Sequence, residues 1–458
     1  MERDLTQGNI IKNILYMSVP TMMGFIAQTL YDLVDMAWIG RISSEAVAAV
    51  TILTSIFWLV EVLNEIIGTS SVSLISQNFG AGNYKQTKAC IEQTLTFKML
   101  VSVIAMILLV IFMKPLIGFF TQEETVQKAA LDYGYLRIFF LPIMFSTYSI
   151  NTALRCIGDS KRPMILMFVT SVINIVLDPI LMFETIPLIN LPGAGLGVYG
   201  AALATVISIS VGFVVGLIMI FNLKNREIRP TVKGIFRLNA KIDKKLITIG
   251  LPTGIEVLFR QLAQITILKV VTVFGTVAVA ALGIQQRLSG FFIMPLIGLL
   301  MGGSTIVGQN MGAEKMERAE KTTHLAATLG GIIMGGVTIF VLLFTEQIMG
   351  VFVNDPEVIR MGVPMLRIIT PSYILLAVGF GWATGFSGAG YNMPFLISAV
   401  IARWGVQIPF MLITIYSLSL PITFIWISFA LSEIAEFAVI AIIFFNGKWK
   451  MKRVSHLV

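Results

Sequence analysis

Long apolar runs follow one another along almost the whole chain, and this pattern restricts the fold more than any other feature. A helix needs about 20 consecutive apolar residues to cross a bilayer. Of the 458 residues, 13% are charged, whereas a soluble domain carries roughly 25%. The chain also lacks the short alternating segments that are typical of an outer-membrane barrel. The sequence therefore predicts an all-α polytopic membrane protein.

We expect twelve transmembrane helices. Their predicted ranges are 11–39, 46–76, 93–118, 133–154, 163–184, 197–222, 243–271, 278–307, 322–345, 361–386, 394–416 and 421–445. An even number of spans places both termini on one side, and most of the 33 Lys and Arg residues fall on that side. The positive-inside rule assigns it to the cytoplasm. We therefore predict a multi-pass protein of the inner or plasma membrane, surrounded by lipid, with both termini cytoplasmic.

Composition argues against several classes of function. The net charge of +8 comes mainly from loop residues beside apolar runs, so we expect no nucleic-acid partner. Cys90, Cys156, His324 and His456 are too few for a disulfide framework or a zinc site. The sequence has neither a phosphate-binding GxxxxGKS/T loop nor an HExxH motif. We expect no enzyme and no organic cofactor.

The two halves of the chain repeat each other. Three pairs of segments match at a constant spacing of 232 residues: VPTMMG with LPTGIE, VAAV with VAAL, and SQNFGAG with GQNMGAE. Further on, LRIFFLP resembles LRIITP at nearly the same spacing. Such a repeat predicts two six-helix lobes with the substrate path between them. We place the first lobe at 1–222, a cytoplasmic connector at 223–242, the second lobe at 243–446 and a basic tail at 447–458.

The first predicted span carries polar residues on one face. Gln28, Tyr31 and Asp35 are spaced i, i+3 and i+7, while Asp32 lies off this face. A carboxylate at membrane depth costs about 2.5–3.5 kcal/mol, so it usually serves an ion, a proton or a substrate. The alternative is that Asp35 reaches out to water at the end of the span. Pro20 removes one backbone donor and predicts a hinge in the same helix.

The fifth predicted span contains a second polar group. Asn174 and Asp178 lie one turn apart, and Pro179 cannot donate to the carbonyl of Ile175. An amide, a carboxylate and a free carbonyl are oxygen ligands that suit a small cation or a protonatable site. We therefore expect a second hinge at Pro179 and a coupling site that could hold Na+ at Asp35, Asn174 and Asp178. The alternative is a kink whose polar groups satisfy each other.

Other charged residues inside the predicted spans receive no assigned role. Glu61 and Glu65 could support the first site or serve packing, and Arg260 or Arg287 could pair with Glu256. Arg403, Lys269, Glu433 and Glu436 also lie inside predicted spans.

Several segments together resemble the multidrug and toxin extrusion (MATE) family. They are P…QTLYDLVD in the first span, QNFGAGN after the second, NTALRCIGDSKRP after the fourth, NIVLDPI in the fifth and GVYGAALATVIS in the sixth. Members of this family export organic cations and other toxic compounds, driven by inward movement of sodium or protons. The resemblance covers essentially the whole chain.

The resemblance is stronger to the prokaryotic DinF-like branch, in which two aspartates couple transport to the ion. By position these are Asp35 and Asp178. Residues that match the polar cluster of that branch are Tyr31, Asn174 and Thr205, with Asn151 and Gln28 matching more loosely. Arg260 stands where the norfloxacin-exporter branch uses a glutamate, and Tyr148 replaces the family's asparagine.

We therefore expect a monomeric antiporter that uses H+ or Na+ to export organic, cationic or amphipathic drugs and toxins. The alternative within transporters is an exporter of a lipid-linked sugar or lipid from the same wider superfamily. FGAGNYKQTK lacks the DRxGRR-like run of a major-facilitator carrier. An intramembrane enzyme would need a nucleophile with its base, or metal ligands, within the spans. A structural or receptor role predicts that neutralising Asp35 and Asp178 changes no flux.

Overall fold

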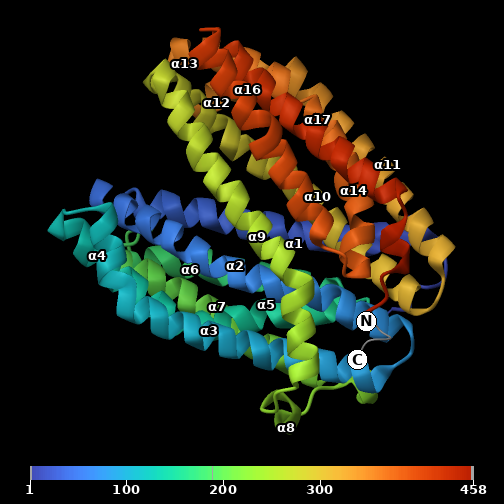
Figure 1. Ribbon diagram of the computed structural model, residues 1–458. Coiled ribbons are helices and arrows are strands. Elements are labelled where there is room, and N and C mark those ends of the chain that lie inside the picture. The colour runs from blue at the N-terminus through green and yellow to red at the C-terminus, as the bar shows by residue number, and fades with distance from the viewer. Residues whose placement is uncertain (1–2, 188, 455–458) are drawn as a thin grey trace. The chain divides into compact units, whose positions relative to one another are not determined.

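The computed structural model describes residues 3–187 and 189–454 (Figure 1). In these ranges the chain is helical throughout, apart from loops and one isolated bridge between Thr185 and Pro192. The first half contains α1 Ile10–Ile39, α2 Ser44–Gly80, α3 Tyr84–Phe120, α4 Glu124–Phe139, α5 Leu141–Cys156, α6 Lys161–Met182, α7 Gly197–Phe221, η1 Arg226–Ile228 and α8 Val232–Ile235. Positions 455–458 of the predicted basic tail lie outside the described residues.

The second half repeats this succession of long helices. It contains α9 Ala240–Val271, η2 Thr272–Phe274, α10 Thr276–Gly312, α11 Met316–Leu343, α12 Thr345–Phe352, α13 Pro356–Ile369, α14 Ser372–Ala389, α15 Met393–Ala399, η3 Val400–Gln407, α16 Ile408–Leu412, η4 Ile413–Ser417, α17 Thr423–Phe445 and η5 Lys448–Met451. The stretch from Met393 to Ser417 forms one continuous span in which η3 and η4 are wide π-helical turns.

Ten helices of the described chain are long and apolar enough to cross a membrane. The pair α13 and α14 makes an eleventh span, bent by 44°. The predicted span 133–154 is corrected, because α4 and α5 are two helices of 16 residues each that meet at Phe140. Exposed apolar side chains line the helices, as on α3 at Ile104, Ile107 and Ile111, which is the surface that lipid requires.

Both broken spans follow from a proline in the repeated LRI segments. Pro142 cannot donate to the carbonyl of Ile138, and Pro371 cannot donate to that of Arg367. The breaks therefore occur at matching places of the two halves, between α4 and α5 and between α13 and α14.

The chain forms two compact units that differ from the predicted lobes in two segments. The first unit contains Met23–Thr248, and the second contains Leu5–Met22 together with Ile249–Leu457. The first part of α1 therefore belongs to the second unit, and the first turns of α9 belong to the first unit. Sequence periodicity could not predict this exchange, because an apolar face does not specify which neighbour covers it.

In the first unit, α2 packs against α3, α4 and α5, and α6 packs against α7. These helices lie side by side in Figure 1, coloured from blue to green. Leu53, Met113, Tyr133 and Phe145 form part of a core that four of the helices share. The connector is fixed to the same unit, because Glu92 Oε1 accepts hydrogen bonds from the Thr231 amide and hydroxyl at 2.7 and 2.9 Å.

In the second unit, α14 packs against α10, α11 and α17. Gly381 allows α14 to approach α11 closely, since a Cβ at this position would lie 2.2 Å from the Cα of Ala327. The N-terminal segment joins this unit through Ile14 and Met17, which pack with Leu299 of α10. The backbone amide of Leu5 also donates to Gln309 Oε1 at 3.2 Å.

Candidate functional site

The predicted polar pair on α6 lies in the interior of the first unit. Asn174 and Asp178 are 1% and 0% exposed. The Asn174 amide Nδ2 lies 3.3 Å from Asp178 Oδ1 and 3.4 Å from Thr205 Oγ1 on α7. Thr205 in turn donates to the carbonyl of Ala201 at 3.1 Å. The structure thus brings together three of the residues predicted from sequence.

Asp35 and Asp178 lie close enough for their charges to interact, although they come from α1 and α6. Asp35 Oδ1 and Asp178 Oδ2 are both buried and have no hydrogen-bond partner in the described structure. Asn174 Oδ1 is buried and unpartnered as well. Three acceptor oxygens without donors can accept a proton or coordinate a small cation.

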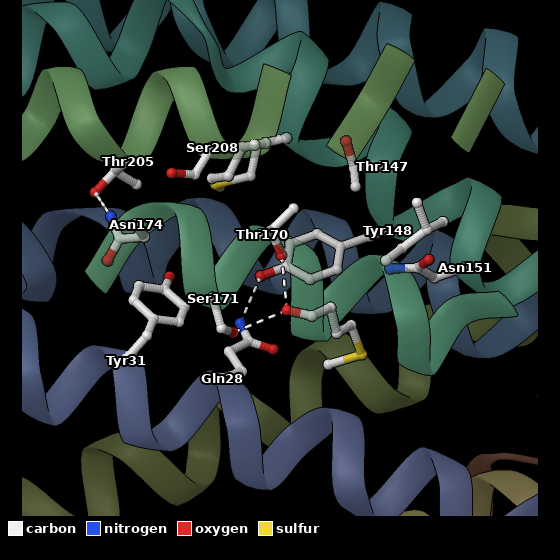
Figure 2. Close-up of a pocket in the computed structure, with 14 residues that line it drawn as sticks. Gln28, Tyr31, Thr147, Tyr148, Asn151, Thr170, Ser171, Asn174, Thr205 and Ser208 are labelled. Carbon is white, nitrogen blue, oxygen red and sulfur yellow. Dashed lines mark hydrogen bonds between the residues drawn. The ribbon is translucent and has the colours of Figure 1, made fainter. Parts of the chain in front are cut away.

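Gln28 and Tyr31 of α1 point toward α6 and line a cavity of about 60 Å³ (Figure 2). Gln28 Nε2 donates to Tyr148 Oη of α5 at 3.4 Å. Asn151, Asn174 and Thr205 also line this cavity, whereas the two aspartates do not. Pockets for drug-sized ligands measure about 300–1,000 Å³, so this cavity has room only for water or an ion.

The two predicted hinge prolines lie in unbroken helices. Pro179 is inside α6 and Pro20 is inside α1. Pro20 belongs to the second unit, three residues before Met23, where α1 enters the first unit.

A family model described as MatE matches residues 20–180 and 252–413, which is most of the chain and repeats once in each half. The chain belongs to the MatE family. It is 28% identical over 96% of its length to the "Probable multidrug resistance protein YoeA" of Bacillus subtilis, of which it covers 94%. It is 25% identical over 97% of its length to the "Probable multidrug resistance protein NorM" of Thermotoga maritima, of which it also covers 94%.

Another relative is named for a different substrate. The "FAD transporter" of Shewanella oneidensis is 25% identical over 85% of this chain, which covers 84% of that protein. Among solved structures, the fold is similar to a MATE transporter described in an "outward-facing conformation", with a TM-score of 0.88 and 24% identity over 99% of this chain and 98% of that one. The predicted twelve-helix fold and the MATE resemblance are thereby confirmed, and this chain is a multi-pass membrane protein of the MatE family.

Sequence reasoning missed Arg137. It is absent from the predicted site residues, but it is partly buried on α4, where Nη1 donates to Tyr133 Oη at 2.9 Å. Its charge acts on both Asp35 and Asp32. No positional signal distinguishes such an arginine from an ordinary flanking charge.

Sequence reasoning also missed cavity residues that a signal could have found. Ser171, Asn174 and Asp178 have the same i, i+3, i+7 spacing as Gln28, Tyr31 and Asp35. Ser171 lines the cavity, as do Thr170 of α6 and Ser208 of α7. Tyr148, noted only as a departure from the family pattern, is the partner of Gln28.

The charged residues left unassigned have partners in the structure. Asn64 donates to Glu61 Oε2 at 2.9 Å, and the fully buried Lys98 acts electrostatically on both Glu61 and Glu65. In the second unit, Arg260 pairs with Glu256 and also with Glu436 of α17, which sequence could not assign. Arg403 pairs with Glu433 at 2.7 Å, while Arg287 is exposed on α10.

Proposed function

We propose that this protein is a cation-coupled antiporter that exports organic, cationic or amphipathic, compounds by alternating access. Asp35 and Asp178 form the coupling site for H+ or Na+, supported by Asn174 and Thr205. The protein acts as a monomer in the cell membrane, with both termini in the cytoplasm. Gln28, Tyr31 and Asn151 line the adjoining polar cavity.

One observation carries this proposal. Two carboxylates from different helices interact across the interior of one unit, and each has a buried oxygen without a donor. Two like charges in a poorly solvated site repel each other, so the site favours binding of a positive ion. Asn174 Nδ2 bonds only one oxygen of Asp178, which leaves the other for the ion. The names of the relatives support drug export as the coupled reaction.

Binding of the ion changes the hydrogen bonds that the first unit offers to α1. α1 contains Pro20 and passes from the second unit to the first after Met22. A bend at this place would couple the site to movement of the units. Pro20 has no backbone N–H to donate within the helix, which makes such a bend less costly. Moving one charge down 100 mV supplies about 2.3 kcal/mol, enough to drive a modest substrate gradient.

The test is efflux of ethidium, a fluorescent organic cation, from vesicles that contain the purified protein. A sodium gradient and a proton gradient are imposed separately. We expect one of the two gradients to drive efflux in the wild type, and Asp35→Asn and Asp178→Asn each to abolish it. FAD is tested in parallel, because one relative carries the name of a FAD transporter.

The matched control is Asp132→Asn, an exposed aspartate on α4 outside the site. It should transport as the wild type does. If efflux continues in both Asp35→Asn and Asp178→Asn, the two aspartates are not the coupling site. If neither gradient drives efflux of ethidium but one drives FAD, the proposed cationic substrate class is wrong.

A further inference from the structure

The second unit contains a cluster of five charged side chains near the middle of its helices, in which the three carboxylates are buried and the two arginines are partly exposed. Three carboxylates face two guanidinium groups, so the ionised cluster would carry one uncompensated negative charge. Its members are Glu256 and Arg260 on α9, Arg403 on η3, and Glu433 and Glu436 on α17. A net charge inside a membrane protein is costly, and it requires a further positive charge.

Arg260 is fully engaged with two carboxylates. Its Nη1 lies 3.3 Å from Glu436 Oε2, and its Nη2 bonds the other oxygen of the same side chain. Its Nε bonds Glu256 Oε1. Glu436 is therefore held at both oxygens by a planar fork, the arrangement that best stabilises an ionised carboxylate.

Arg403 leaves its main partner half satisfied. Its Nη2 donates to Glu433 Oε1 at 2.7 Å, and its Nη1 donates to Gln407 Oε1 at 3.0 Å. Glu436 Oε2 lies farther away, 4.0 Å from Nη2. Glu433 thus receives one hydrogen bond, from Arg403. The same guanidinium also donates to Gln407 and lies near Glu436.

Two polar atoms beside Arg403 have no partner in the described structure. They are Glu433 Oε2 and Gln407 Nε2, on side chains that are 4% and 0% exposed. The amide cannot be turned around, because Arg403 requires the oxygen of Gln407 where it stands. A buried acceptor and a buried donor, both unpaired and beside one guanidinium, indicate a small ligand that satisfies both.

The ionisable groups that face Glu433 come from every side of the cluster. They are Arg403 from η3, Arg260 from α9, Tyr373 from α14 and Glu436 from α17 itself. α13 also packs against α17, but its Arg367 lies 4.0 Å from the exposed Glu346. Its Glu357 and Arg360 line a separate pocket beside Trp426. No further cation of the described structure therefore balances Glu433.

We infer that Glu433 is a proton-binding site of the second unit, served by a water molecule that Gln407 Nε2 holds. A hydronium ion at this position transfers its proton to Glu433 Oε2, which forms an O–H bond and leaves a neutral water. The cluster then carries two positive and two negative charges. A proton fits better than a metal ion, because no described group of three His, Cys, Asp or Glu side chains is arranged to hold one.

The helix that carries Arg403 and Gln407 is built for such a site. Both residues lie in the π-helical stretch Val400–Gln407, and wide turns of this kind often occur at functional positions. In the pair Arg403 and Gln407, the second residue lies two positions before Pro409. In the pair Asn174 and Asp178 on α6, the second residue lies one position before Pro179. Each repeat thus places an i, i+4 polar pair before the proline of the matching helix. Transport coupling in the first unit is not required for this inference.

The experiment is infrared spectroscopy of the purified full-length protein in lipid vesicles during a pH titration, without substrate or gradient. The background carries Asp35→Asn and Asp178→Asn, so that these two carboxyl groups of the first unit do not contribute. We expect the absorption of protonated carboxyl groups to fall by one carboxyl equivalent in Glu433→Gln. Glu346→Gln, at an exposed glutamate on α12 outside the cluster, should retain that absorption in full.

Full retention of the absorption in Glu433→Gln, or its loss in Glu346→Gln instead, would overturn the inference. Gln407→Met provides a second test that keeps Glu433 in place and removes only the amide. It should shift the midpoint of the titration while preserving one carboxyl equivalent. An unchanged midpoint would remove Gln407 from the site. Since the measurement uses no transport, its result is independent of the efflux assay.

Discussion

The two units carry acidic side chains at membrane depth and give them different partners. In the first unit, Asp35 and Asp178 each have a buried oxygen without a donor, and Asp178 is hydrogen bonded by an amide rather than a cation. In the second unit, Glu433 and Glu436 are paired with arginines. The same repeated scaffold thus leaves one pair of carboxylates without an ion pair in the described structure and holds the other pair beside guanidinium groups, with Glu433 Oε2 still lacking a donor. Carboxylates without an ion pair suit ion coupling, and buried carboxylates held by arginines depend on those arginines for stability.

The largest expected effect tests whether arginines hold the buried glutamates of the second unit in place. Arg403→Met should lower the free energy of unfolding by about 3–5 kcal/mol, because it leaves buried Glu433 and Gln407 without their donor. Thermal unfolding in detergent measures the loss. The matched control is Arg287→Met, an exposed arginine on α10, which should stay within about 0.5 kcal/mol. Equal losses in both variants would contradict the comparison.

A second prediction concerns packing in the second unit. Gly381→Ala should destabilise the protein by about 1–3 kcal/mol, since the added methyl group would meet the backbone of Ala327 on α11. Gly335→Ala on the same α11 is the control, because nothing lies within 4 Å of its Cβ position. The melting temperatures of the two variants decide the question. If Gly381→Ala and Gly335→Ala have the same melting temperature, α14 and α11 are less closely packed than described.

A third prediction is that a substitution in the first unit raises the free energy of unfolding instead of lowering it. Asp178→Asn should raise the free energy of unfolding by about 1 kcal/mol while efflux is lost, because a functional site of this kind is maintained at a cost in stability. The substituted amide removes a buried charge that has no cation partner in the described chain. Thermal unfolding and ethidium efflux are measured on the same preparation. A loss of stability as large as that of Arg403→Met would show that Asp178 is structural.

The smallest expected effect compares one tyrosine in each unit. Tyr148→Phe removes the hydrogen bond that Gln28 Nε2 donates to Tyr148 Oη at 3.4 Å. It should lower the free energy of unfolding by about 0.6 kcal/mol, the average for hydrogen bonds between membrane helices. Tyr373→Phe removes the bond from Gln285 Nε2 at 2.8 Å and the contact with Ser289. It should cost about 1 kcal/mol. Unfolding curves of both variants test the order, and the reverse order would weaken the distinction between an open first unit and a rigid second one.

Much of the fold could be predicted from the sequence, because a bilayer imposes long apolar helices and the repeat duplicates them. The prediction did not include the breaks inside two of the spans, at Phe140 between α4 and α5 and at Thr370 between α13 and α14. The proline that follows each break was visible in the sequence, but an apolar run does not show whether a proline bends a helix or divides it. The exchange of Leu5–Met22 into the second unit was also missed, since periodicity does not identify the packing partner.

Part of the candidate site followed from spacing alone. The i, i+3, i+7 pattern placed Gln28 and Tyr31 on one face, and both line the cavity. The pairs of Arg260 with Glu436 and of Arg403 with Glu433 join residues that are 176 and 30 positions apart. Such pairs depend on how α9 and η3 approach α17, which only the folded structure shows. The identity of the coupling ion stays a prediction, because an oxygen-rich acidic site suits both candidates.

The position of the N-terminal segment has a consequence for the order of events during synthesis. Leu5 hydrogen-bonds Gln309, 304 residues later in the chain, and Thr6 accepts from Lys315 Nζ at 3.0 Å. At about 5–20 residues per second, the ribosome needs roughly 15–60 s to reach these partners after it has made Leu5. This N-terminal part therefore completes its contacts only after about 304 further residues have been made, and during that interval its apolar face must be covered by lipid or by the insertion machinery.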